Sequence, residues 1–87
     1  PSTSVATQAL FLMNSDFMAE QSGALARRLE SEPGGRREQV ARAYRLALGR
    51  VPSVKEVTLA DGFFAKGGTL QEFSLALLNR NEFIYIP

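Results

Sequence analysis

The sequence contains neither cysteine nor histidine among its 87 residues. Without cysteine the chain has no disulfide, no thiolate nucleophile and no ligands for an iron–sulfur cluster. Without histidine it lacks the commonest general base and the commonest metal ligand. Covalent c-type haem attachment is also excluded, because it requires the pattern Cys-x-x-Cys-His. The absence of cysteine does not indicate a compartment, since it is compatible with both the cytosol and secretion.

Long apolar runs and an excess of one charge are missing as well. A membrane-spanning helix needs about 18 or more consecutive apolar residues, whereas the longest runs here are residues 9–13 and 83–86. Ten Lys and Arg nearly balance nine Asp and Glu, so the net charge is +1. We therefore expect no membrane span and no strong general attraction to nucleic acid or to an anionic membrane.

The ends of the sequence suggest a part of something larger. No secretory signal peptide is recognisable, and the first residue is Pro1 rather than a methionine. We expect that residues precede Pro1 in a parent protein and that targeting information lies among them. The 87 residues are expected to form one helical domain at the C-terminal side of that parent.

Glycine and proline divide the chain into segments of helical length. Breaks occur at residues 33–35, 49–53 and 67–69, and between them apolar residues recur every three or four positions. No β-hairpin signal is present. The sequence predicts an all-α, compact bundle of four to five short helices with Gly/Pro turns, followed by an extended apolar C-terminal tail. The helices are expected at about residues 3–13, 16–31, 37–48 and 54–66, and from residue 70 onward.

The apolar stripes of these segments predict the core. Val40, Ala43, Tyr44 and Ala47 follow helical spacing most closely. The other predicted stripes are Met18, Leu25 and Leu29, with Phe17 and Ala24 beside them, and Leu70, Phe73, Leu77 and Leu78. The segment at residues 54–66 presents Val57, Asp61 and Phe64 along one edge, with Ala60 and Phe63 nearby.

The turn at residues 49–56 is the most distinctive feature, and we interpret it as a structural corner. Its members are Gly49, Arg50, Pro52, Ser53 and Glu56. Gly49 suits a left-handed helix end, and Ser53 with Glu56 has the spacing of a capping box. We expect the Arg50 guanidinium to bond to helix C-terminal carbonyls, to Glu56 or to Glu82, and consider this structural role more plausible than ligand binding. A second capping box is expected at Thr69–Glu72.

The acidic residues do not form a recognisable catalytic or metal-binding constellation. Glu72 and Glu82 fall near the last helix, but paired acid–base chemistry requires two carboxyls in one pocket with different pKa values. Asp16 and Glu20 are one helical turn apart, which is a common pattern without the spacing of a calcium loop. We assign no catalytic residue, cofactor ligand or metal ligand, and expect no enzyme activity in this chain.

Four arginines in and before the third predicted helix allow two interpretations. They are Arg36, Arg37, Arg42 and Arg45. They could form a weak basic face for phosphates, as in a helix–turn–helix. They could also form an ordinary solvated face, because Glu38 lies among them and nucleic-acid binding calls for one-sided charge. We favour the solvated face and do not expect nucleic acid as a partner.

Three strings in the sequence resemble a known family. They are QALFLMNS at residues 8–15, AYRLALGRVP at residues 43–52 with Glu56, and ALLNRNEFIY at residues 76–85. Together they resemble the C-terminal region of a planctomycete-specific family of unknown function, which often accompanies planctomycete cytochrome c domains. The resemblance implies an exported, envelope-associated parent whose haem-binding portion lies elsewhere. The second and third strings alone are also similar to helical modules related to phycobilisome linkers, which are binding or assembly modules.

These observations lead to three hypotheses of function. The first is a non-catalytic interaction or scaffolding module of an exported multidomain protein, binding upstream domains of the parent chain or another envelope protein. The second is an accessory domain that completes an upstream redox or hydrolytic enzyme. The third is a weak nucleic-acid-binding domain. The expected contact surface is the apolar tail, which alternatively packs on its own core, and its exposure could promote dimers. The tail consists of Phe83, Ile84, Tyr85 and Ile86.

Overall fold

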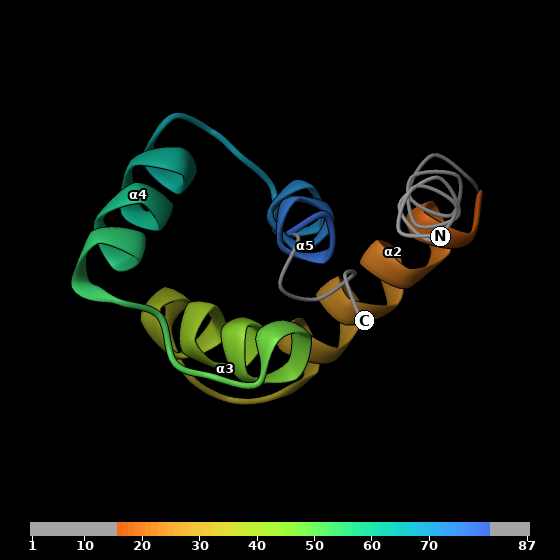
Figure 1. Cartoon of the computed structure of the whole chain (residues 1–87), viewed down its shortest axis with the longest axis horizontal. Coiled ribbons are helices and arrows are strands. Elements are labelled where there is room, and N and C mark those ends of the chain that lie inside the picture. Colours follow the sequence, from red (N-terminus) through yellow and green to blue (C-terminus); the bar gives the residue numbers. More distant parts are fainter. Residues whose placement is uncertain (1–15, 81–87) are drawn as a thin grey trace, which may run out of the picture.

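The computed structural model describes residues 16–80 and contains four α-helices in that range (Figure 1). They are α2 (Asp16–Ser31), α3 (Arg36–Leu48), α4 (Val54–Ala65) and α5 (Leu70–Leu78). The all-α prediction is confirmed. The helices α2, α3 and α4 begin and end within about one residue of the expected positions, and α5 begins where it was expected. The helix expected at residues 3–13 and the tail at residues 83–86 lie outside the described residues.

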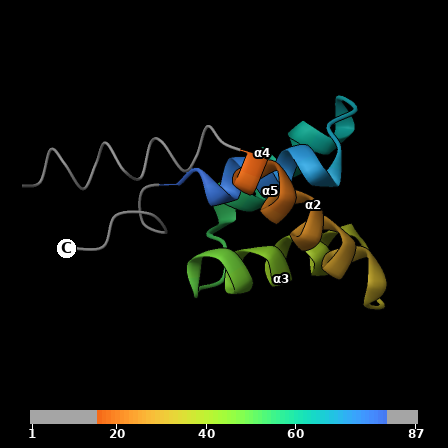
Figure 2. The same ribbon diagram turned by 90° about the vertical axis from the view of Figure 1, so that its right-hand side faces the viewer.

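The short helix α5 lies at the centre of the bundle. It packs most extensively against α2 and also contacts α3. Figure 1 shows α5 end-on between α2 and α4, with α3 crossing below it, and Figure 2 shows α2 and α5 running over α3. The helix α4 lies at the side of this group and packs chiefly against α3. None of these helices is both long enough and apolar enough to cross a membrane.

Two reciprocal caps start α4 and α5, as the sequence predicts. Ser53 Oγ accepts from the backbone N–H of Glu56 at 3.2 Å, and the Glu56 carboxylate accepts from Ser53 N–H at 2.8 Å. The same arrangement joins Thr69 and Glu72, with distances of 3.1 and 2.9 Å. Each cap satisfies backbone donors that have no partner within the helix.

Gly49 and Gly68 lie at positions that favour glycine, the first because of its backbone conformation and the second because of a neighbouring ring. Gly49 ends α3 with φ of 73°, and its N–H donates to the carbonyl of Arg45 at 3.0 Å, as the predicted left-handed helix end requires. Gly68 lies directly under the ring of Phe63, so that a Cβ at this position would overlap the ring. The α4–α5 turn therefore depends on the absence of a side chain at Gly68.

The buried face of α3 agrees with its predicted stripe, whereas that of α2 differs. All four predicted residues of α3 are buried, as are Leu70, Phe73, Leu77 and Leu78 of α5. On α2 the buried positions are Met18, Ser22, Gly23, Ala26 and Leu29. The predicted stripe is wrong at Phe17 and Ala24, which are exposed, and Leu25 is only partly buried.

Small residues explain why α2 turns this unexpected face inward. Ser22 and Ser74 are almost completely buried, and each hydroxyl donates to a carbonyl of its own helix, at 3.0 Å to Ala19 and 2.8 Å to Leu70. Because these hydroxyls are satisfied locally, their burial costs little. Small side chains allow the two helices to approach closely, which a leucine at the same position would prevent.

Aromatic rings join α4 to the centre of the bundle. The Phe73 ring lies 5.1 Å from that of Phe64, 6.2 Å from that of Phe63 and 6.3 Å from that of Tyr44, measured between centroids. Tilted rings at these distances attract one another beyond the burial of their area. Phe73 therefore connects α3, α4 and α5, whereas Phe63 is left at the surface with 36% of its area exposed.

Candidate functional surfaces

The corner between α3 and α4 is built around the Glu56 carboxylate. Arg50 Nη1 donates to Glu56 Oε1 at 2.8 Å, and Arg50 Nη2 donates to Oε2 at 2.9 Å. Arg80, just beyond α5, donates to Oε2 at 3.3 Å. The Arg50 guanidinium also lies 5.6 Å from the Tyr44 ring centroid and donates to the carbonyl of Val51. We call Arg50, Ser53, Glu56 and Arg80 the corner cluster.

These contacts hold Glu56 in its ionised form. The hydrogen bond from Arg50 and the backbone N–H of Ser53 lower the pKa of Glu56 from 4.5 to about 2. The side chain is only 14% exposed, so it is shielded from much of the solvent that weakens surface ion pairs. A carboxylate with this pKa and these occupied lone pairs is poorly suited to donate or accept a proton near neutral pH.

Three of the five residues predicted for the corner, Arg50, Ser53 and Glu56, belong to the corner cluster. Gly49, Arg50, Ser53 and Glu56 all take part in the turn as described, and Pro52 follows the end of α3. Arg80 was missed. It is 24 positions from Glu56, so no local spacing indicates this pair. Among the partners that were expected for Arg50, the structure shows the Glu56 carboxylate.

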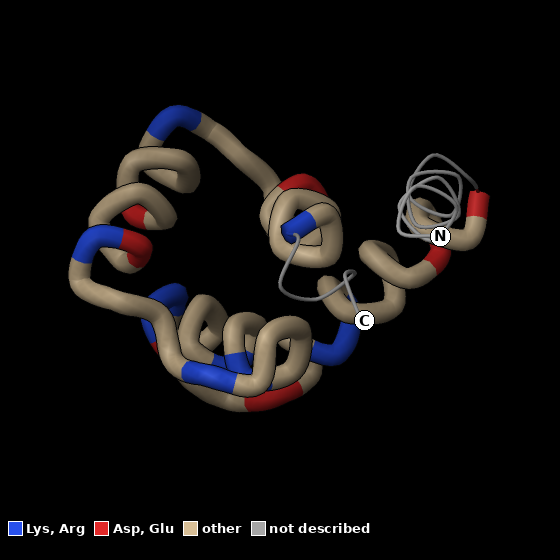
Figure 3. The backbone as a smooth tube through the Cα atoms, in the orientation of Figure 1, with Lys and Arg blue, Asp and Glu red and all other residues tan. Residues whose placement is uncertain are grey.

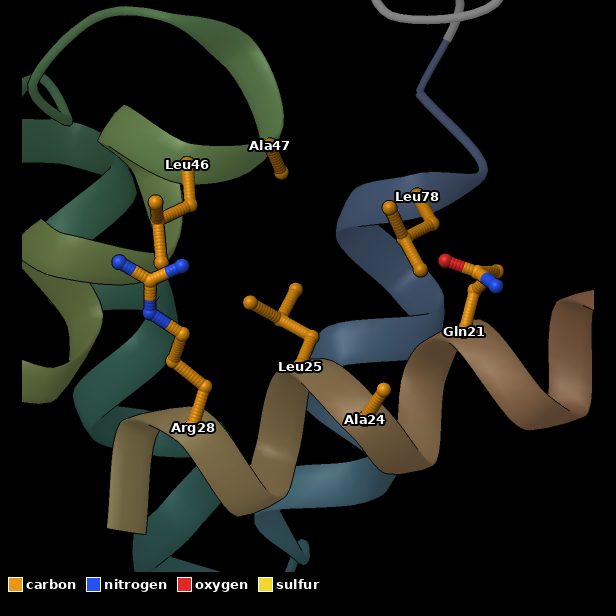
Figure 4. A pocket seen from close by; sticks show the side chains of 7 residues that line it. All are labelled: Gln21, Ala24, Leu25, Arg28, Leu46, Ala47 and Leu78. Atoms are coloured by element: carbon orange, nitrogen blue, oxygen red, sulfur yellow. The ribbon is translucent and has the colours of Figure 1, made fainter. Parts of the chain in front are cut away.

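A shallow groove opens where α2, α3 and α5 meet. Its volume is about 300 Å³. Figure 4 shows the Leu25 side chain rising from α2 toward Ala47 of α3 and Leu78 of α5, with Arg28 and Leu46 at one side. Leu46 is 43% exposed although it is apolar. The lining residues are Gln21, Ala24, Leu25, Arg28, Leu46, Ala47 and Leu78.

The helix α4 presents a second apolar surface. Among its twelve residues, Ala60 is the buried one. Leu59 is 65% exposed and is followed one turn later by the partly exposed Phe63. Lys55 and Lys66 are exposed and fall on the same side by helical spacing. We call Lys55, Leu59, Phe63 and Lys66 the α4 outer face.

Three of the four arginines that were considered as a weak basic face have partners within the domain. Arg37 pairs with Asp61 of α4 at 3.0 Å. The Arg36 guanidinium lies 4.1 Å from the Phe64 ring centroid. Arg42 folds back onto the linker before α3 and is paired with Glu32 at 3.0 Å. Arg45 stays exposed.

Two arginines of α3 therefore have acidic partners in other segments, Asp61 for Arg37 and Glu32 for Arg42. Figure 3 shows basic segments of α3 beside the acidic end of the α2–α3 linker. Arg42 in particular is not on a solvated face, because its side chain is only 20% exposed. Arg36, Arg37 and Arg45 are exposed, as expected of a solvated face, whereas Arg42 departs from that expectation.

The remaining candidate residues are distributed as follows. The Glu72 carboxylate caps α5, and Asp16 and Glu20 are exposed on α2. Within residues 16–80 no group of three or more acidic side chains is arranged to hold a metal ion. Glu82 and the tail residues Phe83, Ile84, Tyr85 and Ile86 lie outside the described residues, so their predicted contacts stay predictions.

Comparison with known proteins supports the resemblance to a family of unknown function. Neither the curated proteins nor the solved structures contain a match to this chain. The sequence profile of the family PSD1, described as a protein of unknown function (DUF1553), matches residues 1–64. This match includes α2, α3, the corner from Gly49 to Glu56 and nearly all of α4. The chain belongs to the PSD1 (DUF1553) family.

Proposed function

We propose that this domain is a non-catalytic interaction module that binds a protein surface through the α4 outer face. The observation that carries the proposal is the exposure of Leu59 and Phe63 on a helix with a single buried residue, Ala60. Apolar side chains exposed in this way, with charged groups at their margin, are typical of protein–protein contact sites.

The chemistry of the described residues supports a binding role rather than catalysis. Glu56 has the strongly lowered pKa, and its oxygens are already occupied by Arg50, Arg80 and the Ser53 N–H. Perturbed carboxyls of this kind occur in structural ion pairs as well as in active sites. Here the arrangement stabilises a corner, and it leaves the carboxylate without an open position for a substrate.

The charges of the α4 outer face indicate the chemistry of the partner. Lys55 and Lys66 lie on either side of Leu59 and Phe63, and they are the two lysines of the chain. A complementary surface would have an apolar centre and carboxylates at both ends. We propose that this surface belongs to an upstream domain of the parent chain or to another envelope protein.

We further propose that the parent protein is exported and works in the cell envelope. The support is the sequence resemblance carried by residues 8–15, 43–52 and 76–85. Protease digestion of intact cells tests this location: the parent protein should be degraded while cytoplasmic marker proteins survive. Survival of the parent protein until the cells are lysed would contradict it.

Carbodiimide cross-linking of the parent protein in intact cells tests the binding role. This reagent joins a lysine amine to a carboxylate that is in direct contact with it. The expected products are amide cross-links from Lys55 or Lys66 to Asp or Glu of one defined partner surface. Substitution Leu59→Ser should remove most of these products, because the apolar centre of the contact is lost.

A second leucine provides the matched control. Leu75 on α5 is also exposed, at 37%, and does not belong to the α4 outer face. The variant Leu75→Ser should keep the cross-links, and circular dichroism should show that both variants stay helical. Cross-links that survive in Leu59→Ser, or lysines joined only to acids of residues 16–80, would overturn the proposal.

A further inference from the structure

We propose that the chain's own residues 83–86 occupy the groove between α2, α3 and α5. This inference concerns other residues than the α4 outer face and is independent of the proposed function. It assigns the apolar tail a place on its own domain, where Leu25, Leu46 and Leu78 supply an apolar lining.

The groove has the chemistry of a site for an apolar segment. Leu25, Ala47 and Leu78 form its floor, and Leu46 stands exposed at its margin (Figure 4). Covering apolar area of this kind stabilises a protein by about 25 cal/mol per Å² removed from water. Gln21 and Arg28 supply the polar margin, as expected where an occupant remains partly in contact with solvent.

The described end of the chain starts from the groove itself. Leu78 is itself a lining residue and ends α5. Arg80 is fixed at the corner that follows α3 directly, through its bond to Glu56 at 3.3 Å. From Leu78 to Phe83 the chain spans five residues, which reach about 16 Å when extended.

The dimensions and composition of the segment also fit. On α2 the groove runs from Gln21 to Arg28, which is a length of about 10 Å along a helix axis. Four residues in extended conformation cover about 13 Å. The segment Phe-Ile-Tyr-Ile is wholly apolar except for one hydroxyl, and a phenol at the groove margin could bond to the Gln21 carboxamide or contact the Arg28 guanidinium.

Nuclear Overhauser effects in the full 87-residue chain test the inference. The expected result is a set of effects between the ring protons of Phe83 or Tyr85 and the methyl groups of Leu25, Leu46 and Leu78. An equimolar mixture of labelled and unlabelled chains distinguishes contacts within one chain from contacts between two copies. The expected effects are intramolecular and disappear in the variant Leu46→Asp, in which amide hydrogen exchange at residues 83–86 accelerates at least about tenfold, as expected for loss of a local closed state.

Leu59→Asp serves as the control because Leu59 is an exposed leucine that does not line the groove. It should leave the effects at Phe83 and Tyr85 unchanged. Effects only between labelled and unlabelled chains would assign the groove to a second copy and overturn the inference. Effects from residues 5–13 to the same methyl groups, or none from Phe83 to Ile86, would overturn it as well.

Discussion

Arg50 and Glu56 face one another through two parallel hydrogen bonds, with N···O distances of 2.8 and 2.9 Å. The planar guanidinium matches the carboxylate in this arrangement, which a lysine could not reproduce. Since Arg50 follows α3 and Glu56 lies in the first turn of α4, the pair fixes the angle between these helices. Arg80 extends the same contact to the end of α5.

The substitution Glu56→Gln is expected to lower the free energy of unfolding by about 2 kcal/mol, because two guanidinium groups lose their charged acceptor. Chemical denaturation followed by circular dichroism measures this change. Glu72→Gln is the matched control: Glu72 has the same position in a capping box but caps Thr69 alone. It should cost no more than about 1 kcal/mol. Equal losses for the two variants would mean that the arginine contacts contribute nothing.

Acid should destabilise the domain through the same carboxyl. The folded state lowers the pKa of Glu56 from 4.5 to about 2, so the unfolded chain binds a proton more readily between these values. The contribution of Glu56 is therefore fully present above pH 4.5 and is lost as the pH falls toward 2, by at most about 3 kcal/mol. Unfolding curves between pH 2 and 6 should show a weaker pH dependence in Glu56→Gln. An unchanged slope would contradict the assignment.

Gly62 inside α4 and Gly68 in the turn that follows it should respond to alanine in opposite directions. Gly68→Ala should cost about 1–3 kcal/mol, because its Cβ would overlap the Phe63 ring and displace it. Gly62→Ala should stabilise the domain by up to about 1 kcal/mol, since Gly62 lies inside α4 with open space around it. Thermal unfolding of the two variants measures both effects. A stabilised Gly68→Ala variant would show that Phe63 does not pack against this backbone.

Local sequence signals predict most of this fold, and the exceptions have a common physical cause. The caps at Ser53 and Thr69 and the glycine end at Gly49 involve neighbouring residues, so their spacing is sufficient to identify them. The buried face of α2 was misassigned because hydrophobicity alone favours Leu25 over Ser22. Close packing against α5 selects small side chains instead, and this requirement depends on a partner helix about 50 positions away in the chain.

The candidate surfaces were harder to predict for the same reason. The Glu56 carboxylate was expected to meet Arg50, which is six positions away, whereas its contact with Arg80 spans 24. The α4 outer face was not recognised, because Leu59 and Phe63 occur on a helix whose apolar content suggests burial. Only the placement of α4 at the side of the bundle leaves them exposed.

Arg80→Gln tests whether the corner cluster holds the end of α5 in place. Arg80 is the last described residue, and its bond to Glu56 joins the exit of α5 to the start of α4. Because one of two guanidinium contacts is lost, amide protection in the last turn of α5, at Leu77 and Leu78, should fall by about 1 kcal/mol.

Hydrogen exchange measured residue by residue distinguishes this local opening from a general loss of stability. Arg37→Gln removes an exposed ion pair with Asp61 and should change protection by less than about 0.5 kcal/mol. If Arg80→Gln lowers protection equally in α2, α3 and α5, the contact stabilises the whole bundle rather than its end. If protection at Leu78 is unchanged, Arg50 alone holds the Glu56 carboxylate, and α5 is positioned by its packing on α2.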